Sequence, residues 1–148
     1  MYIIYKEELY MIDIIAGLKG HGKTKVLLQR ANDDIKLTHG TIVYLDKNNK
    51  HMYELSNQIR LIVVPEFDIA NSDMFIGFIA GILSQDHDLD KIYLDSFLNI
   101  AGIEDNLETV IKKLAVLSDR FDTDFVISAS CEKNTFPESV RKYVSLAL

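Results

Sequence analysis

Apolar runs alternate with stretches of helical periodicity along most of the 148-residue chain. Three segments favour helices: residues 24–30, residues 72–83 with Ser72 or Asp73 as the cap, and residues 107–121. Strands that alternate with helices predict a single α/β domain, with a mainly parallel sheet flanked by helices on both faces. The expected strands are six runs with the length and apolar character of buried strands: residues 10–16, 41–46, 60–64, 91–95, 125–130 and 143–148.

Composition narrows the expected partners and compartment. The net charge is −6 with only four arginines, and no basic stripe is visible, so we expect no intrinsic nucleic-acid signature. The single cysteine, Cys131, excludes an internal disulfide and fits a reducing compartment. The first residues lack the features of a signal peptide, and the most apolar stretch, residues 74–83, has about half the length of a membrane span. We therefore expect a cytoplasmic protein without a membrane span.

A glycine-rich segment directly follows the first expected strand. Residues 17–24 read Gly-Leu-Lys-Gly-His-Gly-Lys-Thr and match G-x-x-x-x-G-K-[ST], the phosphate-binding loop. Its glycines permit positive φ, so that successive N–H groups converge on a polyphosphate, and the following helix adds its positive end. Lys23 would lie between the terminal phosphates, and the Thr24 hydroxyl would ligate Mg²⁺. The segment predicts nucleotide binding by Gly17, Lys19, Gly20, His21, Gly22, Lys23, Thr24 and Lys25.

A second part of the expected site is an acidic residue that faces the magnesium ion. The run 91–95 ends in Asp95, as expected of a strand that carries such a carboxylate to the loop side of the sheet. Magnesium keeps several waters, so Asp95 would act through one of them. We predict Thr24 and Asp95 as the metal-site residues, with Mg²⁺ and ATP bound together.

These segments resemble a minimal RecA-like P-loop ATPase, of the division that inserts a strand between the strand of the glycine loop and that of the acidic residue. The resemblance covers about residues 11–148, and Ser128 and Ser130 lie where the group has the strand tip that senses the γ-phosphate. More narrowly, residues 16–25, Asp95-Ser96 and residues 127–129 are similar to small uncharacterised ATP-binding proteins of Firmicutes. Residues 1–10 precede the resemblance, as an N-terminal arm, an edge strand or a start-site extension.

The chain departs from this group at the residue that orients the attacking water. The group carries a glutamate directly after the acidic residue or in the turn after the second strand, where this chain has Ser96 and Asn48. Asp46 is the nearest acid and the catalytic candidate, whereas Glu66 would lie too far toward the sheet edge. The resemblance implies an ATP-binding protein with weak or partner-stimulated ATPase activity. Arg120 or Arg141 of a neighbouring subunit would complete such a site in a homo-oligomer.

Two other functions stay open. One is a non-catalytic, nucleotide-dependent interaction module for a protein partner, which the missing glutamate favours. The other is a small-molecule kinase, which the scattered arginines and the lack of a long insertion disfavour. We further expect residues 86–90 to form a solvated acidic loop, the helix 72–83 to be buried, and the Gly77 and Gly81 step to mark close packing.

Overall fold

The apolar runs become strands in the computed structural model, which describes residues 11–103 and 106–148. The expectations for residues 1–10 lie outside the described residues. Each strand agrees with its expected range to within about two residues at either end. The strands are β1 (Ile12–Ala16), β2 (Thr41–Asp46), β3 (Arg60–Val63), β4 (Leu89–Leu94), β5 (Asp124–Ala129) and β6 (Val144–Ala147).

The strands form one sheet in the order β3-β2-β4-β5-β1-β6, and every neighbouring pair is parallel. Strand β5 therefore lies between β1, which leads into the glycine loop, and β4, which leads to Asp95. This arrangement agrees with the inserted strand that the resemblance to RecA-like ATPases implied. The register pairs Leu45 of β2 with Leu94 of β4, so that Asp46 and Asp95 leave the sheet side by side.

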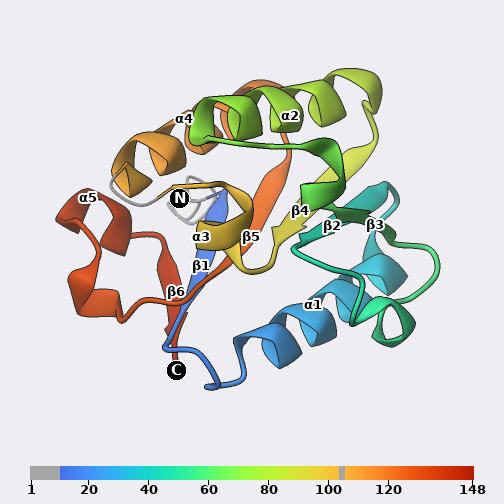
Figure 1. Cartoon of the computed structure of the whole chain (residues 1–148). Coiled ribbons are helices and arrows are strands. Elements are labelled where there is room, and N and C mark those ends of the chain that lie inside the picture. The colour runs from blue at the N-terminus through green and yellow to red at the C-terminus, as the bar shows by residue number, and fades with distance from the viewer. Residues whose placement is uncertain (1–10, 104–105) are drawn as a thin grey trace, which may run out of the picture.

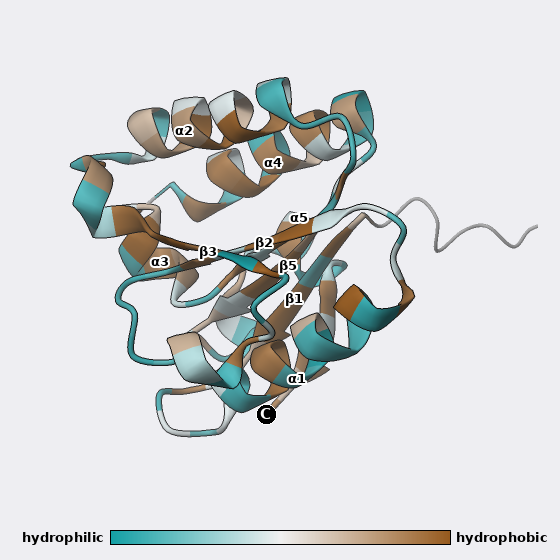
Figure 2. Ribbon diagram, turned by 90° about the vertical axis from the view of Figure 1, so that its right-hand side faces the viewer, coloured by the Kyte–Doolittle hydropathy of each residue, from teal (hydrophilic) through white to brown (hydrophobic). Residues whose placement is uncertain are grey.

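Helices cover both faces of the sheet, as predicted (Figure 1). Helices α2 and α4 pack side by side on one face, and α1 lies alone on the other (Figures 1 and 2). The α-helices are α1 (Lys23–Leu37), α2 (Ser72–Gln85), α3 (Phe97–Ile100), α4 (Leu107–Phe121) and α5 (Glu138–Arg141). Short 3₁₀ turns are η2 (Met52–Glu54), η3 (Val64–Phe67) and η4 (Lys133–Thr135).

Alternate side chains of each central strand enter two separate apolar clusters, because successive residues of a strand point to opposite faces. On β1, for example, Ile12 and Ile14 join the cluster under α2 and α4, whereas Ile15 joins the one under α1. The α1 cluster also contains Leu55 and Ile59 from the segment between β2 and β3, which anchors that segment to the domain. Figure 2 shows the apolar strands between the two layers of helix.

Two helix boundaries differ from the sequence prediction. Helix α1 extends to Leu37, because Ala31 continues the buried stripe after residue 30 and Asp34 accepts a hydrogen bond from Lys91 of β4 at 3.0 Å. Helix α2 is capped by Asn71, whose side chain accepts the Met74 N–H at 2.9 Å, and neither Ser72 nor Asp73 is the cap. Asn and Ser are equivalent caps in a sequence pattern, so the fold decides between them.

Helix α2 is only partly buried, which corrects two expectations. Its buried side chains include Phe75, Ile79 and Leu83, but Met74 is 44% exposed. Gly77 and Gly81 are exposed, and a Cβ built on either meets no atom within 4 Å, so their spacing marks no close packing.

Among the described residues, no helix combines the length and the apolar character that a membrane span requires.

The acidic segment before β4 fixes the start of the sheet and is therefore more than a solvated loop. Asp86 accepts the Thr41 hydroxyl at 2.6 Å, and Asp90 accepts the Thr38 hydroxyl at 2.8 Å. The Thr41 N–H donates to the Asp88 carbonyl at 2.8 Å. A Cβ at Gly40 would lie only 2.1 Å from that carbonyl oxygen, so only glycine fits there.

Candidate functional site

The loop between β1 and α1 owes its shape to its glycines. Gly20 and Gly22 have φ of 89° and 90°, a region that side chains disfavour. Gly22 is the N-cap of α1, and no side chain caps the helix, so N–H groups of its first turn remain available to an anion. Gly17 is closed in by β6: a Cβ there would lie 3.0 Å from the Leu148 carbonyl oxygen.

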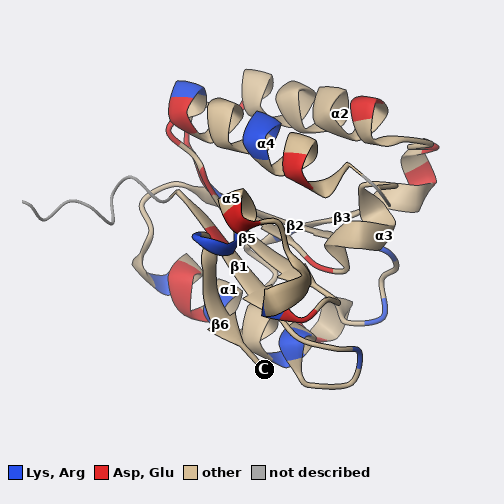
Figure 3. Ribbon diagram, turned by 90° about the vertical axis from the view of Figure 1, so that its left-hand side faces the viewer, with Lys and Arg blue, Asp and Glu red and all other residues tan. Residues whose placement is uncertain are grey.

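A cavity of about 760 Å³ opens beside this loop, at the carboxyl ends of β2, β4 and β5. Ligands of parallel α/β sheets bind at this end of the strands. The cavity brings two carboxylates and four lysines together, and Figure 3 shows further residues of both charges along α1 and α4. Its lining residues are Lys19, Gly20, Gly22, Lys23, Thr24, Asp46, Lys47, Asn48, Lys50, His51, Asp95, Ser96, Asn99, Ser128 and Ser130.

Asp95 is the most heavily hydrogen-bonded side chain at this site. Its Oδ1 accepts from the Thr24 hydroxyl at 3.2 Å, the Ser128 hydroxyl at 2.7 Å and the Ser96 N–H at 2.9 Å. Its Oδ2 accepts from the Tyr44 hydroxyl at 2.8 Å. These donors fix a carboxylate that is only 2% exposed and hold it against the start of α1.

The sequence prediction missed Tyr44. Its hydroxyl reaches Asp95 because β2 and β4 are neighbours, and its ring stacks on that of Tyr93, its register partner, at 6.0 Å between centroids. Burial, reinforced by the negative charge of Asp95, raises the pKa of Tyr44 far above its usual range, so the hydroxyl stays a donor. A strand order guessed from sequence would have been the only signal for this contact.

Lys23 is buried at the base of the cavity, with 7% of the residue exposed. Its Nζ donates to the Leu18 carbonyl of the glycine loop at 3.0 Å. Burial lowers the pKa of Lys23, and the nearby Asp95 carboxylate opposes that shift. Among the described residues, this ammonium donates a hydrogen bond to a neutral carbonyl and is therefore well suited to receive an anion.

Asp46 lies beside Asp95 at the end of β2 and is 3% exposed. Its Oδ1 accepts the Lys47 N–H at 2.7 Å. Burial raises the pKa of Asp46, and the negative charge of Asp95 raises it further. The side chain thus combines a position on the cavity wall with an increased affinity for a proton.

The two serines at the tip of β5 line the same cavity in different ways. Ser128 is 1% exposed and is committed to Asp95, and its oxygen also accepts the Ser96 N–H at 3.0 Å. Ser130 is exposed and faces the opening. Of the pair, Ser130 is the side chain that a ligand reaches without displacing an internal hydrogen bond.

Three of the predicted nucleotide-binding residues do not line this cavity. Gly17 is buried against Leu148, and the His21 ring lies 3.4 Å from the Leu148 carbonyl oxygen. Lys25 is exposed on α1 and lines a neighbouring cavity. The pattern G-x-x-x-x-G-K-[ST] therefore identifies a loop, and the fold decides which of its side chains face the cavity.

The segment after β2 supplies cavity residues that the sequence prediction did not include. Lys47, Lys50 and His51 come from this segment, and Asn99 comes from α3. The two lysines flank a pair of asparagines directly after a strand that ends at the predicted site. This position in the sequence was the signal that could have placed them in the cavity. Ser96 and Asn48 also line the cavity. Among the described residues that line the cavity, none is a glutamate.

The candidate arginines lie elsewhere in the described structure. Arg120 is exposed near the end of α4, and Arg141 in α5 donates from Nε to the Phe136 carbonyl at 2.9 Å. Neither lines the cavity. Glu66 is exposed in η3, directly after the edge strand β3. The described chain alone thus brings lysines, and no arginine, to the cavity.

Comparison with known proteins defines the fold class. No protein-family model and no curated protein matches the sequence. The crystal structure of the flagellar accessory protein FlaH from Methanocaldococcus jannaschii matches with a TM-score of 0.58 and 13% identity, over 92% of this chain and 69% of FlaH. Caenorhabditis elegans PCH-2 matches with a TM-score of 0.54 and 12% identity, over 93% of this chain and 34% of PCH-2.

Both similar structures have P-loop folds, of the RecA-like and AAA kinds. At these identities the likeness establishes the fold alone. The chain is therefore a single α/β domain with a P-loop NTPase-like fold, and its six parallel strands agree with the predicted class.

Proposed function

We propose that this chain binds ATP with Mg²⁺ in the cavity at the carboxyl ends of β2, β4 and β5. One observation carries the proposal: Lys23, Thr24 and Asp95 lie together at the start of α1. The Thr24 hydroxyl donates a hydrogen bond to Oδ1 of Asp95 at 3.2 Å. Nucleotide phosphates would lie on the N–H groups of the glycine loop, and the Lys23 ammonium would leave the Leu18 carbonyl for the terminal phosphates.

The donor set fits a magnesium ion. Thr24 offers a hydroxyl and Asp95 a carboxylate, and hard oxygen ligands are those that Mg²⁺ prefers. Among the described residues, no group of three or more His, Cys, Asp or Glu side chains forms a separate metal site. A nucleotide-bound Mg²⁺ needs no such group, because phosphates and waters complete its coordination. When bound, the ion would neutralise phosphate charge.

Hydrolysis in the isolated chain should be slow. Asp46 is the proposed catalytic carboxylate, because it lines the cavity and its other oxygen, Oδ2, can hold a water. Its side chain is one carbon shorter than that of a glutamate, which limits its reach. Weak or partner-stimulated ATPase activity is therefore the activity we propose. An arginine from a second copy or another partner would be the source of the stimulation.

A non-catalytic, nucleotide-dependent interaction module is the second candidate. It is favoured by the presence of Ser96 and Asn48, in place of a glutamate, on the cavity wall. The proposal of ATP binding also includes three further points. The nucleotide-binding domain comprises residues 11–148, the protein is cytoplasmic, and it is similar to small ATP-binding proteins of Firmicutes. A small-molecule kinase remains the least favoured alternative.

Isothermal titration calorimetry with ATP and ADP, each with Mg²⁺ and with EDTA, tests the proposal. We expect ATP binding that is stronger with Mg²⁺. Phosphate release measured in parallel separates the two candidates: slow turnover supports the ATPase, and tight binding without turnover supports the interaction module. If no nucleoside triphosphate binds to the folded protein, the proposal is wrong.

A further inference from the structure

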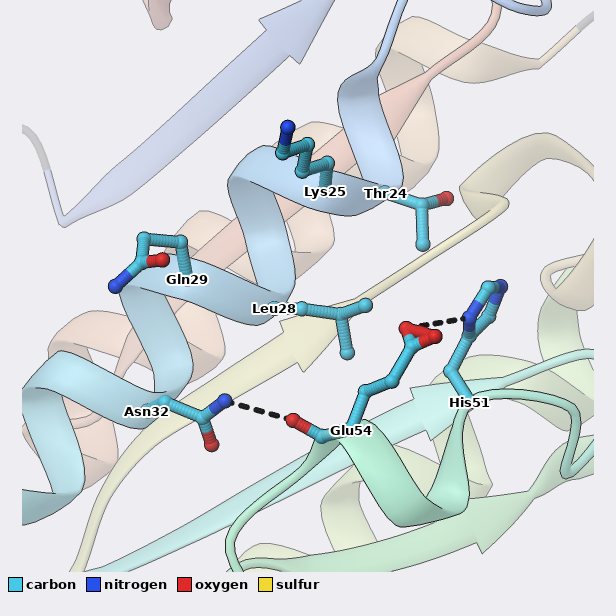
Figure 4. A pocket seen from close by; sticks show the side chains of 7 residues that line it. All are labelled: Thr24, Lys25, Leu28, Gln29, Asn32, His51 and Glu54. Carbon is cyan, nitrogen blue, oxygen red and sulfur yellow. Dashed lines mark hydrogen bonds and ion pairs between the residues drawn. The ribbon is translucent and has the colours of Figure 1, made fainter.

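A second cavity of about 450 Å³ lies beside the first, between α1 and the segment that links β2 to β3 (Figure 4). Thr24 and His51 line both cavities, so the two are adjacent. The other lining residues of the second cavity are Lys25, Leu28, Gln29, Asn32 and Glu54. This neighbour of the proposed nucleotide site contains an imidazole and a carboxylate that the proposed function does not use.

His51 and Glu54 form a pair in this wall. The Nδ1 atom of His51 lies 3.0 Å from Oε2 of Glu54, and the His51 side chain is 28% exposed. In Figure 4 the other ring nitrogen, Nε2, points away from Glu54. A carboxylate bonded to Nδ1 selects the tautomer that leaves Nε2 free to accept a proton, and it stabilises the imidazolium that forms.

The pair is held in place by α1, the helix that begins at the glycine loop. Asn32 donates from Nδ2 to the Glu54 carbonyl at 2.8 Å, and its Oδ1 accepts the Ser56 N–H at 2.8 Å. Leu55, next to Glu54, is buried in the cluster under α1. The C-terminal end of η2 is thus fixed relative to α1, the helix that carries Thr24, and the Glu54 carboxylate in turn holds the His51 ring.

We infer that His51, oriented by Glu54, accepts the proton of the water that attacks the γ-phosphate of ATP. This inference rests on the proposed function. The water oxygen forms a bond to the γ-phosphorus, and the bond from that phosphorus to the β–γ bridging oxygen breaks with its electron pair on ADP. The water proton goes to Nε2, and solvent later removes it. Asp46 then orients the water, and Glu54 and Asn32 are positioning residues.

The charged groups that line the two cavities belong to the expected pH dependence of His51. They lie on the ring's own segment, in the glycine loop, on α1 and at the ends of β2 and β4. Lysine charges disfavour an imidazolium, and carboxylate charges favour it. The five lysines and three carboxylates are Lys19, Lys23, Lys25, Lys47, Lys50, Asp46, Glu54 and Asp95.

The experiment measures single-turnover phosphate release from Mg-ATP between pH 5 and pH 8.5, alongside ATP affinity by calorimetry. In the unmodified chain we expect the rate to fall toward acid pH, because an imidazolium cannot accept a proton. His51→Gln should lower the rate at pH 8 about 100-fold and abolish the acid limb, with ATP affinity changed less than about threefold. His39→Gln is the matched control: His39 is exposed at the opposite end of β2 and should leave rate and profile unchanged.

The positioning role of Glu54 is tested by a separate variant. Glu54→Gln should lower the rate about tenfold and leave ATP affinity within about threefold, because the ring loses the carboxylate that selects its tautomer. Glu66→Gln, a change at the exposed sheet edge, should leave both the rate and the affinity unchanged. A His51→Gln protein that keeps the rate and the acid limb overturns the inference and leaves the proposed function intact. An unmodified chain that binds ATP without hydrolysing it also overturns the inference, and a chain that binds no ATP overturns both.

Discussion

The two ends of the sheet hold carboxylates in different settings. At the carboxyl end, Asp95 accepts four hydrogen bonds beside the Lys23 ammonium. At the amino end, Asp13 and Asp124 are half-buried, and burial raises the pKa of both, that of Asp124 to about 6, with Lys91 only partly opposing the effect. Burial also raises the pKa of Asp46 at the carboxyl end, so the contrast lies between Asp95, which its donors fix, and Asp124, where burial dominates.

Lys23→Ala should break this contrast most strongly. Removing the ammonium from the carboxyl end should lower Mg-ATP affinity more than 100-fold, or about 3 kcal/mol, since Lys23 is the only buried cation among the described residues. The fold should survive, as measured by circular dichroism and thermal unfolding. Lys36→Ala, in the exposed last turn of α1, is the control. Undiminished affinity in a folded Lys23→Ala protein would refute the phosphate-binding role of the loop.

Asp95→Asn tests the carboxyl end of the sheet by replacing the carboxylate with an amide of nearly the same shape. We expect Mg-ATP affinity to fall about tenfold, because the carboxylate no longer faces the water shell of the ion. In EDTA the affinity should change less than about twofold. Calorimetry under both conditions is the measurement. An equal loss in EDTA would mean that Asp95 serves the local hydrogen-bond network and not the metal.

Asp46→Asn tests the other carboxylate of that end. The unmodified chain should turn over less than about once per second, below ordinary enzymes. The turnover rate of the variant should be about tenfold lower still, because an amide orients water less well than a carboxylate. Phosphate release under saturating Mg-ATP measures both rates. Turnover of several per second in the unmodified chain contradicts the weak-site proposal, and an unchanged rate in the variant contradicts the choice of Asp46.

Asp124→Asn addresses the amino end and should have the smallest effect. The folded-state pKa of about 6 exceeds the usual 3.8, so the stability contribution of this group is full below pH 3.8 and is lost as pH rises through 6. The amide cannot ionise and removes that loss, so the variant should be more stable at pH 7.5. Because solvent screens a half-buried group, we expect a gain of only about 1 kcal/mol. At pH 4 the difference should nearly vanish. Urea unfolding at both pH values checks this, and a variant that is less stable at pH 7.5 would contradict it.

Patterns confined to one element were readable from the sequence. The run 41–46 predicted the bounds of β2, and the periodicity of residues 107–121 predicted those of α4, because continuous apolar runs and helical spacing each indicate one element. The four-residue helices α3 and α5 were missed, since they are too short to show a period. Lys23 and Asp95 were predicted as site residues on local patterns alone, and their roles stay predictions.

Features that depend on the sheet order were not readable. Tyr44 reaches Asp95 only because β2 and β4 are adjacent, and nothing in the run 41–46 says so. His51 and Glu54 lie in a segment without periodicity, so their pairing follows from η2 and from the contacts of Asn32. The Gly77 and Gly81 step misled for the same reason: a helix face is buried only where another element covers it.

Gly40 gives this fold a point of remote mutational sensitivity. A methyl group there meets the Asp88 carbonyl and would disturb the register between β2 and β4. That register brings Asp46 beside Asp95 six residues later, about 20 Å along the strand. A random-mutagenesis screen for lost nucleotide binding should therefore return Gly40 substitutions alongside those in the cavity wall. Such a distant hit would reflect a shift in strand alignment and no contact with the ligand.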